Sequence, residues 1–521
     1  VQKILISARS QPEVLLLAGA GRDAGYLFKY NVRTRKSFAF HDPRISEGYV
    51  YFDMEGNPRI ESQVDGSGIH YWIRVKPNSG WRRLDATVKQ PGLHFDCSGS
   101  NLLDRVADII RFGPDGNTLY IGSRVGSDCF KLAAYDVSTG RISRTIAQLP
   151  HVDLSNSDFL DFRPLFAKHT SRLLGLIFED VRPRVAWLDP RFAAIQRMMD
   201  AARPNHFNEP IDWTDDGTTM VYLSSSDQDA GTYFVVHPDR GEMIPLLQRD
   251  SYLKGKPLAK TEYLRFPARD GHLIPAYLTR PVGASDPVPL VVLIHGGPMA
   301  RDTWGFSAWN QFLASRGYAV LQVNYRGSSG YGAAYQKAGL EARLDTVVLD
   351  DIADGARYLI DRGVADPKRV VAMGASFGGW ATYMSLIKYP DLYRAGIALA
   401  AVSDWRKAIS DDRWWFNNPG SANFWKALLR NYDGGPADRF IEPVLRAAEL
   451  RQPILIAQGG QDHVVSSEEA QRMLDALRKT NSNVVPVDLP NSSHSYMPFD
   501  DQVIFLDAVA AFLDTYVSGS R

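Results

Sequence analysis

The sequence has little cysteine and no net charge, and each shortage excludes a class of protein. Only two cysteines, Cys97 and Cys129, occur among 521 residues. They exclude a disulfide-rich scaffold and show no metal-binding spacing, but they leave open one disulfide or two buried thiols. Lys plus Arg and Asp plus Glu both number 59, so the formal charge is zero. This balance gives no sign of nucleic acid or an anionic membrane as a partner.

Long apolar runs are also missing, since none reaches the roughly 20 residues that a membrane-spanning helix needs. We therefore expect no membrane partner. The chain begins with Val1 rather than Met, so we expect residues upstream, and the location stays open between cytoplasm and periplasm. A chain of 521 residues, 45% of them hydrophobic, exceeds one hydrophobic core and predicts two or more domains.

Residues 1–255 repeat a pattern of short strands and polar turns. The clearest unit, residues 109–146, holds the turn signal GPDG, followed by LYIGSR and KLAAYDVSTG. Serial hairpins in units of about 40–50 residues are typical of propeller blades, and we count about five such units. The alternative is an irregular array of β-sandwich sheets. We predict an all-β propeller over residues 1–255, with further blades upstream of Val1.

Residues 256–521 alternate strands with helices, which predicts a doubly wound, mostly parallel sheet covered on both faces. Functional residues of such a sheet lie in the loops at the carboxyl ends of its strands. The expected strands are residues 290–295, 318–324, 370–373, 397–402, 454–458 and 484–489. The expected helices are residues 309–315, 349–362, 380–387, 467–478 and 502–516.

Residues 370–380 read VVAMGASFGGW, a G-x-S-x-G pattern between a strand and a helix. This is the pattern of the nucleophile elbow of α/β hydrolases, where glycines permit a tight turn and the serine takes a strained backbone. The plain alternative is a strand-to-helix turn that carries a serine by chance. We predict an α/β-hydrolase domain over residues 256–521 with Ser376 as the nucleophile.

A serine nucleophile needs a base and an orienting acid, which in this fold follow in the order Ser, acid, His. His494 lies in the segment NSSHSY, after strand 484–489 and before the last helix. We predict it as the base, against the alternative of a surface-loop histidine. Asp462 follows strand 454–458 and is the predicted acid. Its neighbour His463 and the strand residue Asp488 are less suitable by position.

The oxyanion of acyl transfer needs two backbone N–H donors. One predicted donor is Phe377, directly after the nucleophile. The second is expected from Gly296 or Gly297, in the sequence HGGP that follows strand 290–295. Glycines there allow the backbone to approach a substrate closely.

The motifs HGGP (295–298), NYRGSSGYG (324–332) and GASFGG (374–379), together with Asp462 and His494, resemble the prolyl oligopeptidase family of serine peptidases. The resemblance is greatest to its acylaminoacyl-peptidase and dipeptidyl-peptidase branches. It differs in three places, one of which is Ser495 after His494, where the family commonly has Gly. The family usually has Tyr after the nucleophile and His-Gly before the acid, where this sequence has Phe377 and Gln458-Gly459.

The resemblance implies a β-propeller before the catalytic domain, and it implies that Val402, Trp405 and Val465 line an apolar S1 pocket. For Trp405 the alternative is ordinary core packing. The function that it implies is hydrolysis of short peptides without cofactor or metal, with the propeller limiting substrate size. A carboxylesterase, an isopeptidase of the lasso-peptide type and an inactive interaction module are the alternatives. Exopeptidase or endopeptidase action, the natural substrate and homo-oligomerisation stay open.

Overall fold

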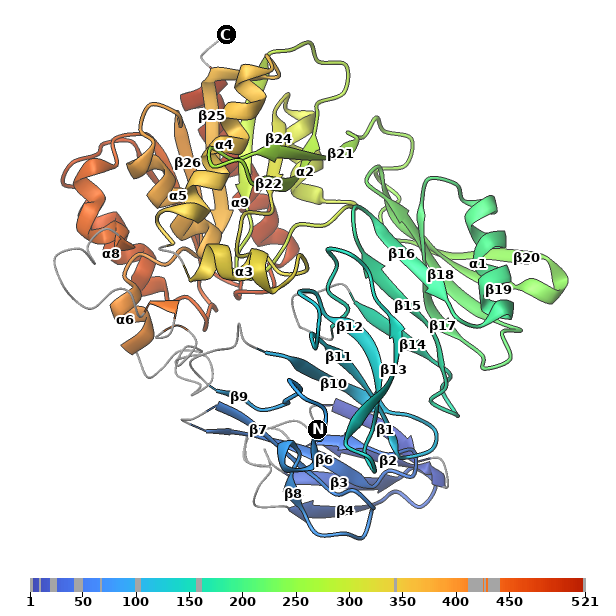
Figure 1. The fold of residues 1–521 in the computed structure, drawn as a ribbon. Coiled ribbons are helices and arrows are strands. Elements are labelled where there is room, and N and C mark those ends of the chain that lie inside the picture. The colour runs from blue at the N-terminus through green and yellow to red at the C-terminus, as the bar shows by residue number, and fades with distance from the viewer. Residues whose placement is uncertain are drawn as a thin grey trace. The chain divides into compact units, whose positions relative to one another are not determined.

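The computed structural model describes residues 3–518 except 9–10, 19–25, 42–49, 66–67, 99–104, 156–161, 342–343, 411–424, 426–427 and 430–440 (Figure 1). The chain forms two compact units. The first comprises Val1–Ser224, Tyr233–Leu247 and Gly330–Ala333, and the second comprises Ser225–Thr232, Gln248–Ser329 and Ala334–Arg521. Each unit is described by itself.

In its described part, the first unit is built from consecutive antiparallel sheets, each of which joins strands that are neighbours in sequence. The sheets are β1–β4 (Lys3–Ala8, Gln11–Ala18, Tyr26–Asn31, Lys36–His41), β5–β9 (Val50–Phe52, Pro58–Asp65, Gly68–Ile73, Arg82–Arg83, Cys97–Ser98), β10–β13 (Ala107–Phe112, Thr118–Ser123, Lys131–Asp136, Arg141–Ala147), β14–β16 (Arg163–Phe166, Leu173–Glu179, Pro183–Trp187) and β17–β20 (Phe207–Trp213, Met220–Ser226, Asp229–His237, Glu242–Gln248). Sequence-local hairpins of this kind follow from the turn signals, as at Asp115, whose carboxylate accepts from Thr118 N–H at 2.7 Å.

Separate hydrophobic cores lie between successive sheets of this unit. One core joins Ile60 and Ile73 of the second sheet to Ile121 of the third. Another joins Leu132 of the third sheet to Leu176 of the fourth. The apolar residues of each strand are thus shared between the two neighbouring sheets, as the alternation along the strands requires.

A helix in the first unit was not predicted. Helix α1 (Pro190–Ala202) begins after Asp189, whose carboxylate accepts from Arg191 N–H at 2.9 Å. An aspartate cap followed by proline is a helix start that the sequence displays. The helix buries Phe192 and Met199 in a core shared with β18 and β19.

The second unit contains an eight-stranded sheet in the order β21-β22-β24-β23-β25-β26-β27-β28. Its strands are Thr261–Pro267, Leu273–Thr279, Val288–Ile294, Ala319–Val323, Ala365–Ala375, Ala395–Leu399, Ile454–Gly459 and Val484–Leu489, for β21 to β28 in turn. The pairs from β24 to β28 are parallel, and β21 and β22 are antiparallel. This confirms the predicted mostly parallel sheet.

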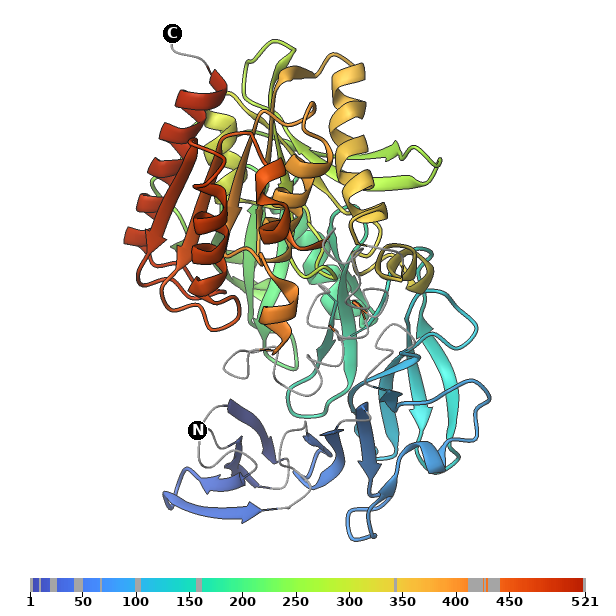
Figure 2. The ribbon, with the colours of Figure 1, turned by 90° about the vertical axis from the view of Figure 1, so that its left-hand side faces the viewer.

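Helices cover both faces of this sheet (Figures 1 and 2). Helices α2 (Ala308–Ser315) and α9 (Phe499–Leu513) share one core with the strands. Helices α4 (Val347–Asp361) and α5 (Phe377–Lys388) lie against the other face, where Gly355 of α4 approaches Leu321 and Gly396 of β26 approaches Leu386 of α5. Helix α8 (Ser467–Leu477) packs beside β27.

Several local expectations were wrong. The helices α3 (Ala333–Leu340) and α6 (Trp405–Ser410) were not predicted. Strand β26 ends at Leu399, so Val402 lies beyond the strand that it was expected to end. The state of Cys97 and Cys129 was left open, and both are buried thiols outside any disulfide. In the part of the chain that is described, we find no helix with the length and apolar character that a membrane span requires.

Candidate active site

Ser376 lies in a tight turn between β25, which ends at Ala375, and α5, which begins at Phe377. Its backbone has φ 59° and ψ −122°, a conformation that side chains other than glycine rarely adopt. The turn closes because its flanking glycines have no Cβ. A Cβ on Gly374 would lie 2.4 Å from Gly378 O, and one on Gly378 would lie 2.1 Å from Ile294 O. This is the geometry that the G-x-S-x-G pattern predicts.

Three side chains from three strand ends meet at this turn. His494 follows β28, and its Nε2 lies 3.1 Å from Ser376 Oγ. Its Nδ1 lies 2.8 Å from Oδ2 of Asp462, which follows β27. The His494 side chain is 20% exposed and that of Asp462 is 1% exposed. The structure therefore brings the three predicted residues into one hydrogen-bonded chain, open to solvent at the imidazole.

The carboxylate of Asp462 is fixed at both oxygens. Oδ1 accepts from the backbone N–H groups of Val464 and Val465, each at 2.8 Å. The loop is closed by Gln458, whose Nε2 donates to Val465 O at 3.0 Å. Because Asp462 accepts on each side, its partner on His494 is the Nδ1–H group. The Nε2 of His494 is then free to accept the Ser376 proton.

The loop that carries His494 is anchored by a second aspartate. Asp501, in the first turn of α9, is 1% exposed. Its Oδ2 accepts from Ser492 Oγ at 2.7 Å and from Asn491 N–H at 2.9 Å. These hydrogen bonds, led by that of Ser492, hold the pKa of Asp501 below its ordinary value. Asp501 thus fixes the chain two residues before the imidazole.

The glycine loop 295–298 lies against Ser376. A Cβ on Gly296 would be 3.4 Å from Ser376 Cβ and 4.0 Å from its Oγ. Gly297 has φ 118°, which only glycine adopts readily. Phe377 is the first residue of α5, so its N–H lies at a helix N-terminus, where developing negative charge is favoured. The structure thus places Gly296 against Ser376 and Phe377 directly after it, and Gly297 is the next residue of the same glycine loop.

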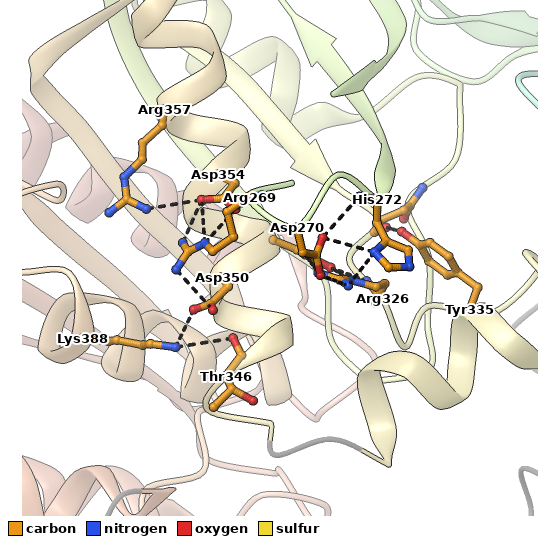
Figure 3. A network of polar contacts seen from close by, with 12 residues as sticks. Arg269, Asp270, His272, Arg326, Tyr335, Thr346, Asp350, Asp354, Arg357 and Lys388 are labelled. Carbon is orange, nitrogen blue, oxygen red and sulfur yellow. Dashed lines mark hydrogen bonds and ion pairs between the residues drawn. The ribbon is translucent and has the colours of Figure 1, made fainter. Parts of the chain in front are cut away.

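The loop 324–329, within the motif NYRGSSGYG, packs against the glycine loop 295–298. The ring of Tyr325 stacks on His295, with centroids 4.2 Å apart. Arg326 follows Tyr325 in the same loop. Its guanidinium donates to Asp351 Oδ1 at 2.6 Å and to Asp270 Oδ2 at 2.5 Å. Figure 3 shows Arg326 beside Asp270 and His272, with the separate ion pairs of Arg269 nearby.

The three predicted pocket residues are almost fully buried. Val402, Trp405 and Val465 are each 1% exposed. Trp405 stacks on Trp425 with ring centroids 4.5 Å apart, which is the core-packing arrangement that the sequence left as the alternative. Val465 contributes its N–H to Asp462. Their role in an S1 pocket stays a prediction.

Sequence reasoning did not single out Tyr325, Ser328, Asp501 or Glu469 as site residues. Glu469 of α8 is 1% exposed, and its carboxylate accepts from the N–H groups of Ser403 and Asp404, each at 2.8 Å. It thereby ties the loop after β26 to the helix after Asp462. The one sequence feature that could have pointed to Ser328 was its position inside the motif NYRGSSGYG, on which the family resemblance partly rests. Among the described residues no group of three or more His, Cys, Asp or Glu side chains could hold a metal ion.

Comparison with known proteins finds similar chains among peptidases. Residues 304–520 match the model of the prolyl oligopeptidase family. Dipeptidyl aminopeptidase BIII of Pseudoxanthomonas mexicana is 28% identical over 526 residues, which cover 98% of this chain and 72% of the relative. The fold resembles that of puromycin hydrolase, with a TM-score of 0.70, 21% identity and coverage of 94% of this chain and 73% of the other.

The fold also resembles that of the acylaminoacyl peptidase of Pyrococcus horikoshii, with a TM-score of 0.66 and 18% identity. That likeness covers 95% of this chain and 75% of the other. Sequence and fold thus point to the same group of proteins. Residues 304–520 therefore match the prolyl oligopeptidase family of serine peptidases, and the chain as a whole is similar to peptidases in sequence and in fold.

Proposed function

We propose that this peptidase cleaves short peptides with Ser376 as nucleophile, His494 as general base and Asp462 as the orienting acid. The observation that carries the proposal is the unbroken chain from Ser376 Oγ through His494 to Asp462, with links of 3.1 Å and 2.8 Å. Each member follows a different strand of one sheet, so the rigid sheet holds the three in register.

In the proposed reaction, Ser376 Oγ attacks the scissile carbonyl while His494 Nε2 takes its proton. The oxyanion accepts hydrogen bonds from Phe377 N–H and from an N–H of the glycine loop 295–298. The C–N bond then breaks, and His494 gives the proton to the leaving amine. A water molecule, deprotonated by His494, hydrolyses the acyl-enzyme and restores Ser376.

For the substrate we propose peptides cleaved near an end. The supporting observation is the identity of the relatives, whose names describe a dipeptidyl aminopeptidase and an acylaminoacyl peptidase. These are peptidases, so we propose neither the carboxylesterase nor the isopeptidase as the function. Peptides with free and with blocked N-termini, compared at equal length, separate the two kinds of end recognition.

We further propose that the antiparallel sheets of the first unit are blades of a β-propeller that restricts entry to short peptides. Two observations support this: the strands of each sheet are consecutive, and separate cores lie between successive sheets. A folded domain of 100 residues has a radius of gyration of about 13 Å and would be excluded. A mixed digest of short peptides and a folded, protease-sensitive protein tests it. Equal cleavage of both would contradict the restriction.

Active-site labelling tests the nucleophile. A fluorophosphonate should label the protein on Ser376 alone, and Ser376→Ala should remove both labelling and turnover without changing the thermal midpoint. Ser328 and Ser403, each 0% exposed, are the internal comparison. Peptide mapping that placed the adduct on either of them would sink the assignment.

A further inference from the structure

His295 is a half-buried imidazole that the proposed reaction does not use. Its ring lies flat on Tyr325, with 16° between the planes. Both ring nitrogens have close polar neighbours. Nδ1 lies 2.9 Å from the carbonyl oxygen of Gly296, and Nε2 lies 2.8 Å from Ser328 Oγ. The ring therefore joins the glycine loop to the loop 324–329.

The proton positions on this ring follow from its neighbours. A carbonyl oxygen only accepts, so Nδ1 must carry a proton to bond Gly296 O. Burial lowers the pKa of His295 to about 4, so near pH 7 the ring is neutral and holds one proton. Nε2 is then an acceptor, and the Ser328 hydroxyl is its donor.

The opposite tautomer leaves an acceptor facing an acceptor. With the proton on Nε2, the Nδ1 lone pair would lie 2.9 Å from Gly296 O. Ser328 Oγ also lies 2.8 Å from Tyr325 O, which offers its proton another acceptor. That carbonyl already accepts from Ser328 N–H at 3.0 Å, so it does not require the hydroxyl. In the opposite tautomer Nδ1 could accept from Tyr325 Oη, 3.2 Å away, but its lone pair would still face Gly296 O. The Nδ1–H tautomer instead gives Gly296 O and both ring nitrogens a partner.

The tautomer of His295 determines the orientation of the Gly296–Gly297 peptide group, which lies next to the proposed catalytic serine. The Gly296–Gly297 bond is not among the cis bonds of the chain. In a planar trans peptide, the N–H points away from the carbonyl. Holding the carbonyl of Gly296 on His295 therefore turns the N–H of Gly297 to the other side of the loop. Gly296 itself lies against Ser376, so this peptide borders the site where an oxyanion would form.

The donor of this arrangement is held rigidly. Ser328 is 0% exposed and belongs to the loop anchored by Arg326. The Arg326 side chain is 6% exposed, and its Nε and Nη2 reach the two oxygens of Asp351 at 3.0 Å and 2.6 Å. Its backbone N–H donates to the same carboxylate at 2.9 Å. Figure 3 shows Arg326 beside Asp270 and His272.

We propose that Ser328 is a positioning residue that stabilises the Nδ1–H tautomer of His295 by donating to Nε2 and thereby helps to orient the Gly297 N–H for the oxyanion. This inference rests on the proposed function, because it assigns a support to the glycine loop of that same site. Ser328 acts through His295 and does not touch the substrate.

The test combines a spectroscopic and a kinetic readout on Ser328→Ala. In the native protein, the ¹⁵N shifts of His295 should report the Nδ1–H tautomer, and in Ser328→Ala they should report a mixture of tautomers. The variant should lose about 10-fold in kcat with little change in KM, since an oxyanion donor is worth roughly 100- to 1,000-fold when removed outright and less when misaligned. Affinity for a peptide aldehyde, which forms an oxyanion on Ser376, should fall by the same factor.

Ser329→Ala is the matched control, because Ser329 Oγ accepts from Gln336, whereas the hydroxyl on His295 Nε2 is that of Ser328. It should retain the native tautomer and kcat. An Nε2–H tautomer in the native protein would overturn the proposal even if Ser328→Ala did not fold. Unchanged kcat in a folded Ser328→Ala would also overturn it. Neither result tests the assignment of Ser376 as the nucleophile. If that assignment were wrong, the fluorophosphonate would label another residue.

Discussion

The backbone N–H of Gln461 donates to the carbonyl oxygen of Ser492 at 3.0 Å. This one hydrogen bond joins the loop that carries Asp462 to the loop that carries His494, two residues from the imidazole. Gly459 permits the approach, since a Cβ there would lie 2.5 Å from the same carbonyl. The distance between the proposed acid and base is therefore set by backbone contact as well as by their side chains.

Replacing Asp501 should disturb the position of the proposed base, His494, through the loop that carries it. Asp501→Ala removes the acceptor of Ser492 and Asn491, so the His494 loop loses its anchor to α9. We expect kcat to fall about 10-fold while KM changes little, because misplacing a catalytic group is costly. The measurement is steady-state kinetics on a short peptide.

The control is Asp500→Ala, since Asp500 is exposed in the same helical turn. The depressed pKa of Asp501 adds a pH test. Its contribution to stability should be present above its unfolded pKa and should be lost as the pH falls through the lower folded value. A thermal midpoint of Asp501→Ala that parallels the native protein through acidification would contradict this.

Asp462→Asn should leave a folded but slow enzyme. The amide would place a donor where the carboxylate now accepts from Val464, Val465 and His494, so the imidazole would lose its oriented tautomer. A loss of about 10⁴-fold in kcat is the expected order for such a change. Asp488→Asn is the comparison, because Asp488 is an exposed residue of β28. Equal losses in the two variants would remove Asp462 from the proposed triad.

Glu442 should make stability depend on pH. Its side chain is 1% exposed, and burial, the main cause, raises its pKa from 4.5 to about 7. The folded protein then binds more protons than the unfolded chain between these values, so stability should fall as pH rises through this window. Glu442→Gln keeps an oxygen for Trp405 N–H, which now donates to Oε2 at 2.7 Å.

We expect Glu442→Gln to raise the free energy of unfolding at pH 8 by roughly 2–4 kcal/mol, and to leave it nearly unchanged at pH 4. Urea unfolding at the two pH values measures this difference. Glu449→Gln is the control, since Glu449 is exposed and pairs with Arg446. A gain that is equal at both pH values would show that titration is not its cause.

Trp405→Ala separates the packing role from the pocket role. The stacked contact with Trp425 and a 1% exposed fraction predict a loss of about 3–5 kcal/mol in the free energy of unfolding. Trp405→Phe should recover much of that loss. If the residue instead lines S1, KM for peptides with apolar P1 residues should rise while the unfolding free energy stays near native. Denaturant unfolding and KM, measured on both variants, decide between the two roles.

Arg326→Met should destabilise the second unit strongly, because it leaves the fully buried Asp351 without its cation. Breaking a buried ion pair on one side costs about 3–5 kcal/mol. Arg357→Met is a matched control, on the helix α4 that also carries Asp351. Arg357 is 43% exposed and pairs with Asp354 at 3.3 Å, so its loss should cost under about 1 kcal/mol. Similar unfolding midpoints for the two variants would contradict the burial argument.

The sequence by itself determined the elements whose signals are local. The parallel strands could be read from apolar runs, and β28 matches its expected bounds of 484–489. The elbow at Ser376 could be read because a strained turn needs glycines at fixed offsets. Helix α1 also had a local signal, the Asp189 cap and Pro190, and was overlooked among the strands.

Tertiary structure alone decided what depends on contacts between distant segments. His494 and Ser376 are 118 positions apart, and their 3.1 Å contact exists only once β25 and β28 lie in one sheet. The burial of Trp405 and the lack of a disulfide between Cys97 and Cys129 also depend on neighbours that no local pattern names. So does the support that Ser328 gives His295. A hydrogen bond between distant segments depends on the positions of two groups. Sequence periodicity describes only the local segment that holds one of them.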